Sequence, residues 1–177
     1  RVPQKASKPT YSDPGAIGIG RVFEKHYTKD ISIRLKRLLE AEGAKVVMLR
    51  KRDQNPSLAR RCYIAIKSRA NLLISVHVNS FIKPYARGSE TYYYKKKDYP
   101  LAKAIQREMV KTLRLRNNGV KRARMYVLTH TYMPGALIEP CFITNPNENR
   151  LVKTAAFRQK IANATYKGIL SYYSTRN

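Results

Sequence analysis

Apolar residues follow two periods along the chain, and the two alternate from one end to the other. Helical spacing occurs over 27–41, 56–69, 100–113 and 157–172, and short apolar runs typical of strands occur over 45–49, 72–76, 88–94, 125–128 and 136–139. Strands that alternate with helices indicate an α/β fold. We therefore expect a single domain built on a mostly parallel, twisted sheet with helices on both faces.

The same pattern predicts where elements begin and end and which side chains face inward. Asn55-Pro56 predicts an N-cap with proline in the first turn, and Gly43 predicts the end of the first helix. The run 72–76 is apolar throughout, which is typical of a central strand buried on both faces. The helix residues expected to be buried are Leu58, Cys62 and Ala65, then Leu101, Ile105 and Met109, and finally Phe157, Ile161, Ala164, Gly168 and Tyr172.

The composition adds one unusual feature, which is a large excess of positive charge. The 177 residues include 36 Lys and Arg against 11 Asp and Glu, a net charge of +25. Apolar residues make up 43% of the chain, which is enough for a core, and no run approaches the roughly 18 apolar residues of a membrane-spanning helix. A domain this basic favours an anionic partner: nucleic acid, an anionic membrane or an anionic cell wall. Composition alone does not choose among these.

Cysteine usage and the chain ends add little. Cys62 and Cys141 predict two buried thiols rather than a disulfide, and no CxxC pair indicates a zinc knuckle or a redox site. The opening residues show no signal-peptide pattern, and the chain has no repeat of fixed period and no low-complexity linker. We treat residues 1–177 as one domain.

Two titratable side chains stand at the ends of predicted core strands. His77 directly follows the run 72–76, and Glu139 ends the run 136–139. In such sheets ligands bind beyond the carboxyl ends of the strands, so both side chains should project toward a site there. His77 is either a metal or catalytic residue or a strand-end histidine bonded to backbone; Glu139 is either a catalytic carboxylate or half of a salt bridge. The helix dipole suffices to explain Glu24 before the first helix.

A series of short motifs also runs along the chain in a fixed order. Their order and spacing resemble those of the zinc-dependent N-acetylmuramoyl-L-alanine amidases of bacterial cell walls, from Asp13 to about Tyr173. The motifs are DPGAIG (13–18), EK (24–25), LEAEGAKVVM (39–48), SLARR (57–61), LISVHVNS (73–80), GVKRA (119–123), YVL (126–128) and MPGALIEPCFITNP (133–146).

This resemblance implies a zinc enzyme that cleaves the amide between N-acetylmuramic acid and L-alanine in peptidoglycan. By the resemblance, Glu24 and His77 are zinc ligands and Glu139 is the general base for the zinc-bound water. The chemistry is sensible, because an open zinc site lowers the pKa of bound water toward about 7 and a nearby carboxylate can move the proton. A periplasmic or secreted location follows, and an activator protein is a candidate partner.

The chain departs from the family at its first metal ligand. The family supplies a histidine from an Asp-Pro-Gly-His-Gly-Gly type loop, whereas the divergent segment 1–12 contains no histidine. Three interpretations stay open. In the first, the domain has lost zinc and binds cell wall or nucleic acid as a pseudoenzyme, in a nucleoprotein assembly for example. In the second, His26 or His130 supplies the third zinc ligand. In the third, the opening residues differ from the natural segment. Pro140-Cys141 and Ile66 also depart from the family and touch no predicted ligand.

Overall fold

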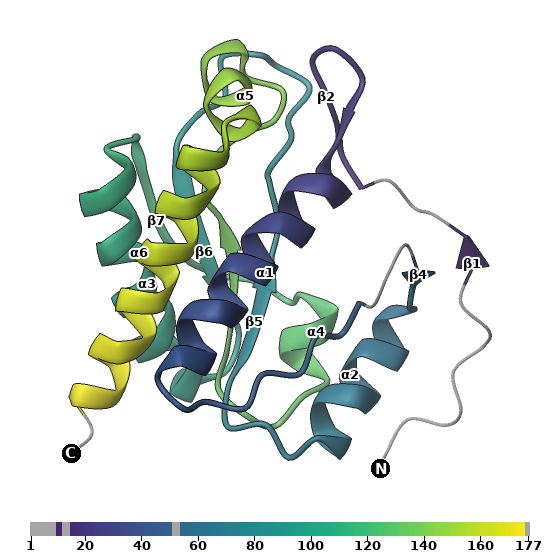
Figure 1. Cartoon of the computed structure of the whole chain (residues 1–177), viewed down its shortest axis with the longest axis vertical. Coiled ribbons are helices and arrows are strands. Elements are labelled where there is room, and N and C mark those ends of the chain that lie inside the picture. Colours follow the sequence, from purple (N-terminus) through teal and green to yellow (C-terminus); the bar gives the residue numbers. More distant parts are fainter. Residues whose placement is uncertain (1–9, 12–14, 51–53, 176–177) are drawn as a thin grey trace.

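The central feature of the fold is a four-stranded sheet. The computed structural model describes residues 10–11, 15–50 and 54–175. The strands lie in the order β5 (Leu73–Val76), β8 (Gly135–Glu139), β6 (Ser89–Tyr93), β7 (Asn117–Arg122). Figure 1 labels β5, β6 and β7 of this sheet. The pairs β5–β8 and β6–β7 are parallel, and the central pair β6–β8 is antiparallel. Two of the three pairings are parallel, so the prediction of a mostly parallel sheet is confirmed.

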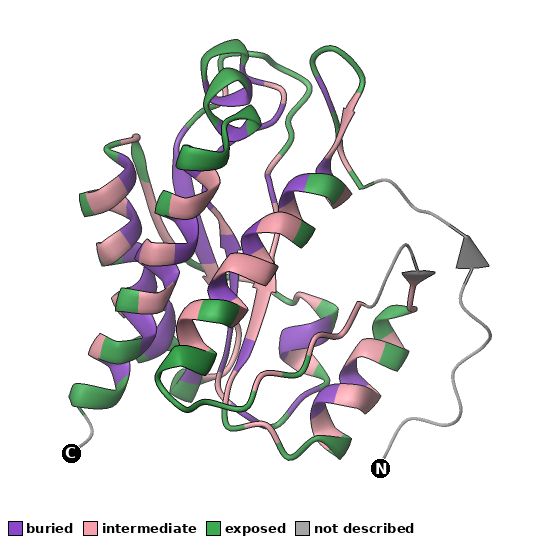
Figure 2. Cartoon of the chain, viewed as in Figure 1, coloured by how far each residue is buried: buried purple, intermediate pink, exposed green. Residues whose placement is uncertain are grey.

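Three long helices cover one face of this sheet. They are α1 (Glu24–Ala41), α3 (Tyr99–Leu113) and α6 (Ala155–Ser174), and the short helix α5 (Pro146–Lys153) leads into α6. Ala136 and Ile138 of β8 point toward this layer and are 0% exposed. Figure 2 shows the buried residues gathered on the strands and on the helix surfaces that face them. This layer forms the larger of two apolar clusters and holds most of the core.

Two shorter helices cover the other face. Cys62 and Ala65 of α2 (Leu58–Lys67) pack with α4 (Tyr126–Thr129) against Leu73 of β5 and Leu137 of β8. Leu137 lies between Ala136 and Ile138 in sequence and faces the opposite layer, as the alternation along a strand requires. Helices on both faces of the sheet are therefore confirmed.

The remaining elements are short. Two-residue strands form the antiparallel pairs β1 (Thr10–Tyr11) with β4 (Gln54–Asn55), and β2 (Ile17–Gly18) with β3 (Val22–Phe23). A single 3-10 turn, η1 (Lys96–Asp98), precedes α3. None of the described helices is long and apolar enough to cross a membrane.

The predicted helices and most of their inward residues are confirmed. Gly43, with φ +81°, follows α1 directly, and the six buried positions predicted in α3 and α6 between Leu101 and Ala164 are at most 6% exposed. Cys62 and Cys141 are both buried and form no disulfide. Leu58 is an error of the prediction, because it is 48% exposed at the first turn of α2. The N-cap of α2 is Ser57 rather than Asn55, and the Ser57 side chain accepts a hydrogen bond from the Arg60 N–H.

Two predicted strands are wrong, for different reasons. Residues 45–49 are irregular and join no sheet within the described chain, and a strand exists only through its partner. Residues 126–129 form the helix α4, because a short apolar run fits a buried helix turn as well as a strand. The run 72–76 does form β5, but β5 lies at the edge of the described sheet rather than at its centre. The divergent segment 1–12 lies outside the described residues except for 10–11.

Candidate functional site

Glu24 is the first residue of α1, and hydrogen bonds orient both of its carboxylate oxygens. Oε1 lies 3.0 Å from His77 Nδ1 and accepts the Val78 N–H at 3.1 Å, while Oε2 accepts the Ala16 N–H at 2.8 Å. Burial alone would raise the pKa of Glu24, but the contacts with His77 and with the N–H groups of Ala16 and Val78 hold it below its ordinary value. Glu24 is therefore an oriented carboxylate at neutral pH.

The backbone beside Glu24 leaves room only for glycine. Gly15 has φ +70°, and a Cβ placed there would lie 2.5 Å from Glu24 Oε2. The Glu24 N–H in turn donates to the carbonyl of Ala16 at 2.9 Å. Gly15 and Ala16 thus lie closely against this carboxylate, which explains why residue 15 is a glycine.

His77 lies at the carboxyl end of β5, as the sequence predicted. Its N–H donates to the carbonyl of Ile138 in β8 at 3.0 Å, which ties the end of one strand to the next. Its ring faces Glu24, and 36% of the side chain is exposed. The backbone of His77 therefore extends the sheet, while the imidazole is directed to a carboxylate at a solvent-accessible edge.

Glu139 is the last residue of β8 and lacks the partner that a structural carboxylate would have. Its Oε2 is buried and makes no hydrogen bond within the described structure. Burial, followed by the negative charges of Glu24 and Glu90, raises the pKa of Glu139 well above its ordinary value. None of the described ion pairs includes Glu139, although the chain has 36 Lys and Arg. The salt-bridge interpretation of Glu139 therefore finds no support among these residues.

The sequence analysis did not single out Glu90, which lies opposite Glu139 across the β6–β8 pair. Oε1 of Glu90 accepts hydrogen bonds from Asn79 Nδ2 at 2.8 Å and from the Tyr92 hydroxyl at 2.6 Å, and Oε2 is paired with Lys121 Nζ. Burial and the bond to Glu90 raise the pKa of Tyr92, which keeps its hydroxyl a donor. The sequence could have pointed to Glu90, because it is one of only 11 acidic residues and falls in a predicted strand.

Glu24 and His77 are hydrogen-bonded to each other, and their facing atoms are close enough together to serve as two ligands of one ion. Two donor atoms about 2.0–2.1 Å from a tetrahedral zinc lie about 3.3 Å apart, and the two atoms here are 3.0 Å apart. A catalytic zinc site uses three protein ligands. Within residues 10–11, 15–50 and 54–175, no group of three or more His, Cys, Asp or Glu that could hold a metal occurs. The described residues thus fit part of a zinc site and do not complete it.

The structure does not add either remaining histidine to that pair. His26 is two residues after Glu24 on α1, a spacing that directs side chains to different sides of a helix, and it is exposed. His130 is exposed as well; its ring stacks on Tyr126 at 3.9 Å and its Nδ1 contacts the Tyr126 carbonyl. Neither histidine therefore joins Glu24 and His77 in a group that could hold a metal within the described residues. Glu139 is near enough to feel the negative charge of Glu24.

Comparison with known sequences gives a consistent picture. The sequence profile described as N-acetylmuramoyl-L-alanine amidase matches residues 10–171. The chain is 38% identical over 165 residues to the N-acetylmuramoyl-L-alanine amidase LytC of Bacillus subtilis (strain 168), covering 91% of this chain and 33% of LytC. It is 32% identical over 181 residues to the germination-specific N-acetylmuramoyl-L-alanine amidase of the same organism, covering 93% and 76%. The chain thus spans about a third of LytC.

The fold has solved counterparts. The CwlD amidase from Clostridioides difficile, solved in complex with the GerS lipoprotein, superposes with a TM-score of 0.88 at 30% identity, covering 92% of this chain and 93% of that one. Sequence profile, relatives and fold therefore point to one family over nearly the whole described chain.

Proposed function

The chain belongs to the family of N-acetylmuramoyl-L-alanine amidases, and on that premise we propose that it hydrolyses the amide between N-acetylmuramic acid and L-alanine in peptidoglycan. The observation that carries the proposal is Glu139, whose buried Oε2 has no described partner at the strand edge beside Glu24 and His77. A carboxyl group with a raised pKa exchanges protons nearer to neutral pH, as general acid–base catalysis requires.

Glu139 is the residue that moves the proton. Its carboxylate accepts a proton from the attacking water, and the resulting acid donates that proton to the amide nitrogen as the C–N bond breaks. Burial, and after it the negative charges of Glu24 and Glu90, raise the pKa of Glu139 and so make its carboxylate a stronger base than that of an isolated glutamate. Lys121 offsets the charge of Glu90, and Asn79 and Tyr92 hold that side chain in place.

Zinc is the proposed cofactor, with Glu24 and His77 as two of its ligands. A bound zinc ion supplies a water of lowered pKa and polarises the scissile carbonyl. Hydrogen bonds to Ala16 N–H and Val78 N–H already orient the Glu24 carboxylate, so little ordering would be needed on binding. The third ligand is unassigned within the described residues.

The proposed place of action is the cell wall outside the membrane. The relatives named above are wall and germination amidases, and a net charge of +25 attracts this chain to an anionic polymer. CwlD was solved in complex with the GerS lipoprotein, and we propose a lipoprotein as the partner class of this chain, with activation as its role.

The incomplete donor set favours a second function. With only two metal donors brought together in the described residues, the same fold would act as a binding protein for cell wall or nucleic acid through its positive charge. This alternative predicts retention that weakens steeply with salt and no hydrolysis.

Zinc content and hydrolysis measured on the same purified samples separate these functions. The expected result is bound zinc and dye release from labelled cell wall in the wild type. His77→Ala should lose the metal and the activity, whereas Glu139→Ala should keep the metal and lose turnover. Glu40→Ala, on the exposed side of α1, is the control and should keep both. Equal metal loss in the His77 and Glu139 variants would show that their roles are misassigned. A wild type without zinc or hydrolysis would support the binding protein.

A further inference from the structure

One end of the molecule, uppermost in Figure 1, carries a concentration of exposed apolar side chains. Three segments meet there, and we call their outer surface the apical surface: the β2–β3 hairpin (17–23), the loop 81–87 and helix α5. Single exposed apolar residues are ordinary on a protein surface, but a grouping of them marks an interaction site. Of the 13 large apolar or aromatic side chains that are exposed in the described chain, six lie on the apical surface: Ile17, Ile19, Phe81, Ile82, Tyr85 and Leu151.

Hydrogen bonds fix the loop 81–87 to the start of α5. Asn145 Nδ2 donates to the carbonyl of Pro84 at 2.9 Å, and the Gly88 N–H donates to Glu148 Oε1 at 2.7 Å. Glu148 is only 3% exposed, so it serves the fold as a buried acceptor. The loop therefore presents its side chains from a backbone that is already ordered, which lowers the entropy cost of binding.

The hairpin is fixed to the same helix. Asn149 Nδ2 of α5 donates to the carbonyl of Ile19 at 2.9 Å. Gly18 lies so close to Ile143 that a Cβ at this position would clash with the Ile143 side chain. Helix α5 thus joins the hairpin and the loop into one surface.

The tip of the loop 81–87 is the most apolar part of this surface. Ile82 is 91% exposed, more than any other large apolar side chain of the described residues, and Phe81 and Tyr85 are 53% and 69% exposed. An aliphatic side chain beside two aromatic ones is the combination that enters the boundary between lipid headgroups and acyl chains. The tyrosine hydroxyl stays at headgroup level there, while its ring is buried.

The charge of the apical surface selects an anionic partner. Its only acidic residue is the buried Glu148, whereas its five cations are all exposed: Arg21, Lys83, Arg87, Arg150 and Lys153. The Lys83 ammonium lies 5.7 Å from the centre of the Tyr85 ring, so charge and apolar surface are adjacent at the tip. Cations beside a membrane-inserting tip contact lipid phosphates, and each favours binding to an anionic leaflet.

We propose that the apical surface binds an anionic phospholipid bilayer. Phe81, Ile82 and Tyr85 enter the boundary between headgroups and acyl chains, and the five cations contact the lipid phosphates. Phe81 follows His77 by four residues, so binding holds the candidate site close to the bilayer. A bilayer beside the cell wall rests on the proposed function, whereas binding to the lipid does not.

The test uses the purified chain in EDTA and vesicles without peptidoglycan, so its result is independent of zinc and hydrolysis. The chain has no tryptophan, so Ile82→Trp adds one fluorescent reporter at the tip. Leu170→Trp adds one at a 41% exposed position of α6, toward the opposite end of the molecule (Figure 1). With vesicles of phosphatidylglycerol and phosphatidylcholine, the emission of the Ile82→Trp variant should shift to the blue and be quenched by brominated acyl chains. The Leu170→Trp variant should show neither change.

Matched variants measure the apolar and the charged contributions by co-sedimentation with the same vesicles. Ile82→Ser should weaken binding at least about tenfold, because it removes a side chain that becomes buried in lipid, and Leu170→Ser should change binding by less than about twofold. Lys83→Glu should weaken binding at least about fivefold, and Lys167→Glu, exposed on α6, by less than about twofold. All four positions are exposed, so the unfolding midpoints should stay close to that of the wild type.

Three outcomes would overturn the proposal. Equal vesicle binding by Ile82→Ser and the wild type, or unchanged emission of the Ile82→Trp variant, would mean that net charge alone holds the chain to the vesicle. Sedimentation with purified cell wall but not with vesicles would assign the surface to a wall polymer. Dimer formation that Ile82→Ser abolishes, without vesicle binding, would assign it to a second copy of the chain.

Discussion

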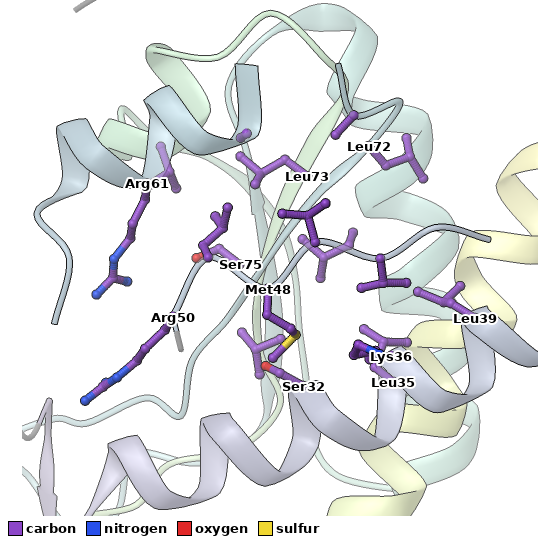
Figure 3. A pocket seen from close by; sticks show the side chains of 18 of the residues that line it. Ser32, Leu35, Lys36, Leu39, Met48, Arg50, Arg61, Leu72, Leu73 and Ser75 are labelled. Carbon is purple, nitrogen blue, oxygen red and sulfur yellow. The ribbon is translucent and has the colours of Figure 1, made fainter. Parts of the chain in front are cut away.

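The two strands that end at the candidate site are supported very differently. β8 lies between two other strands of the sheet. Its residues Ala136 and Ile138 are 0% exposed beneath the layer of long helices. Within the described residues β5 has a neighbour on one side only, and a cavity of about 710 Å³ lies beside it (Figure 3). Glu139, the proposed proton-transfer group, therefore stands on a strand that is paired on both sides. His77, a proposed metal ligand, stands on a strand whose one described neighbour is β8. The difference teaches that the position of His77 depends on β8, whereas Glu139 has support from two strands.

The largest expected effect comes from truncating the core on each side of this comparison. Ile138→Ala should lower the free energy of unfolding by about 2–5 kcal/mol, because it leaves a cavity in a closed core. Met48→Ala removes a side chain that already borders the cavity beside β5 and should cost less than about 1 kcal/mol. Urea denaturation of both variants measures the contrast; equal losses would contradict the difference in packing between the two strands.

A second effect tests how tightly the helical layer on the β8 side is packed. A Cβ at Gly168 of α6 would lie 2.5 Å from the Cα of Ile105 in α3, so the two helix backbones are in close contact. Gly168→Ala should therefore lower the free energy of unfolding by about 1–3 kcal/mol, despite alanine's better helix propensity. Leu170→Ala, at a 41% exposed position of the same helix, is the control for thermal unfolding. A Gly168→Ala variant as stable as the wild type would contradict this close contact.

The smallest effect concerns the ion pairs that join α1 to α6. Asp30 Oδ2 is bonded to Arg34 at 2.9 Å and to Arg158 of α6. Burial alone would raise the pKa of Asp30, but these two guanidinium groups hold it below its ordinary value. Asp30→Asn should cost about 1 kcal/mol or less at pH 6, because the carboxylate is a third exposed.

The pH dependence of that loss has a definite sign. A carboxyl group whose pKa is lowered on folding stabilises the folded state above its unfolded pKa, and the stabilisation disappears as the pH falls through the folded pKa. The difference between wild type and Asp30→Asn should therefore be full at pH 6 and should shrink below about pH 4. A difference that grows toward low pH would contradict the ion-pair account.

Elements with their own local signals were predictable from the sequence. The helices α1 and α3 have an apolar stripe that repeats at helical spacing, and α1 ends beside Gly43 at φ +81°. Residues 45–49 were predicted as a strand because their apolar pattern is a strand pattern, but strand formation depends on a neighbour that no local pattern reports. β7 was missed for the complementary reason: its sequence NNGVKR is polar, and only pairing with β6 makes it a strand.

In the candidate site too, some residues could be predicted from local sequence patterns and others could not. The positions of His77 and Glu139 followed from apolar runs that end in a titratable residue, and the structure places both at the carboxyl edge of the sheet. Glu90 could not be found from sequence alone, because its importance comes from cross-strand register and from contacts with Asn79 and Lys121 that are distant in sequence. The pairing of Glu24 with His77, 53 residues apart, was suggested by the family resemblance and not by any local pattern.

The most direct test of the account follows the bond that is broken. Purified chain, supplied with zinc, is incubated with a muramyl peptide, and the products are identified by mass spectrometry. The account predicts release of a peptide with a free L-alanine amino group. It also predicts that Glu139→Gln lowers the rate by about 10²–10⁴-fold while its zinc content and unfolding midpoint stay unchanged. Cleavage at another bond, or a Glu139→Gln rate within about threefold of the wild type, would contradict it.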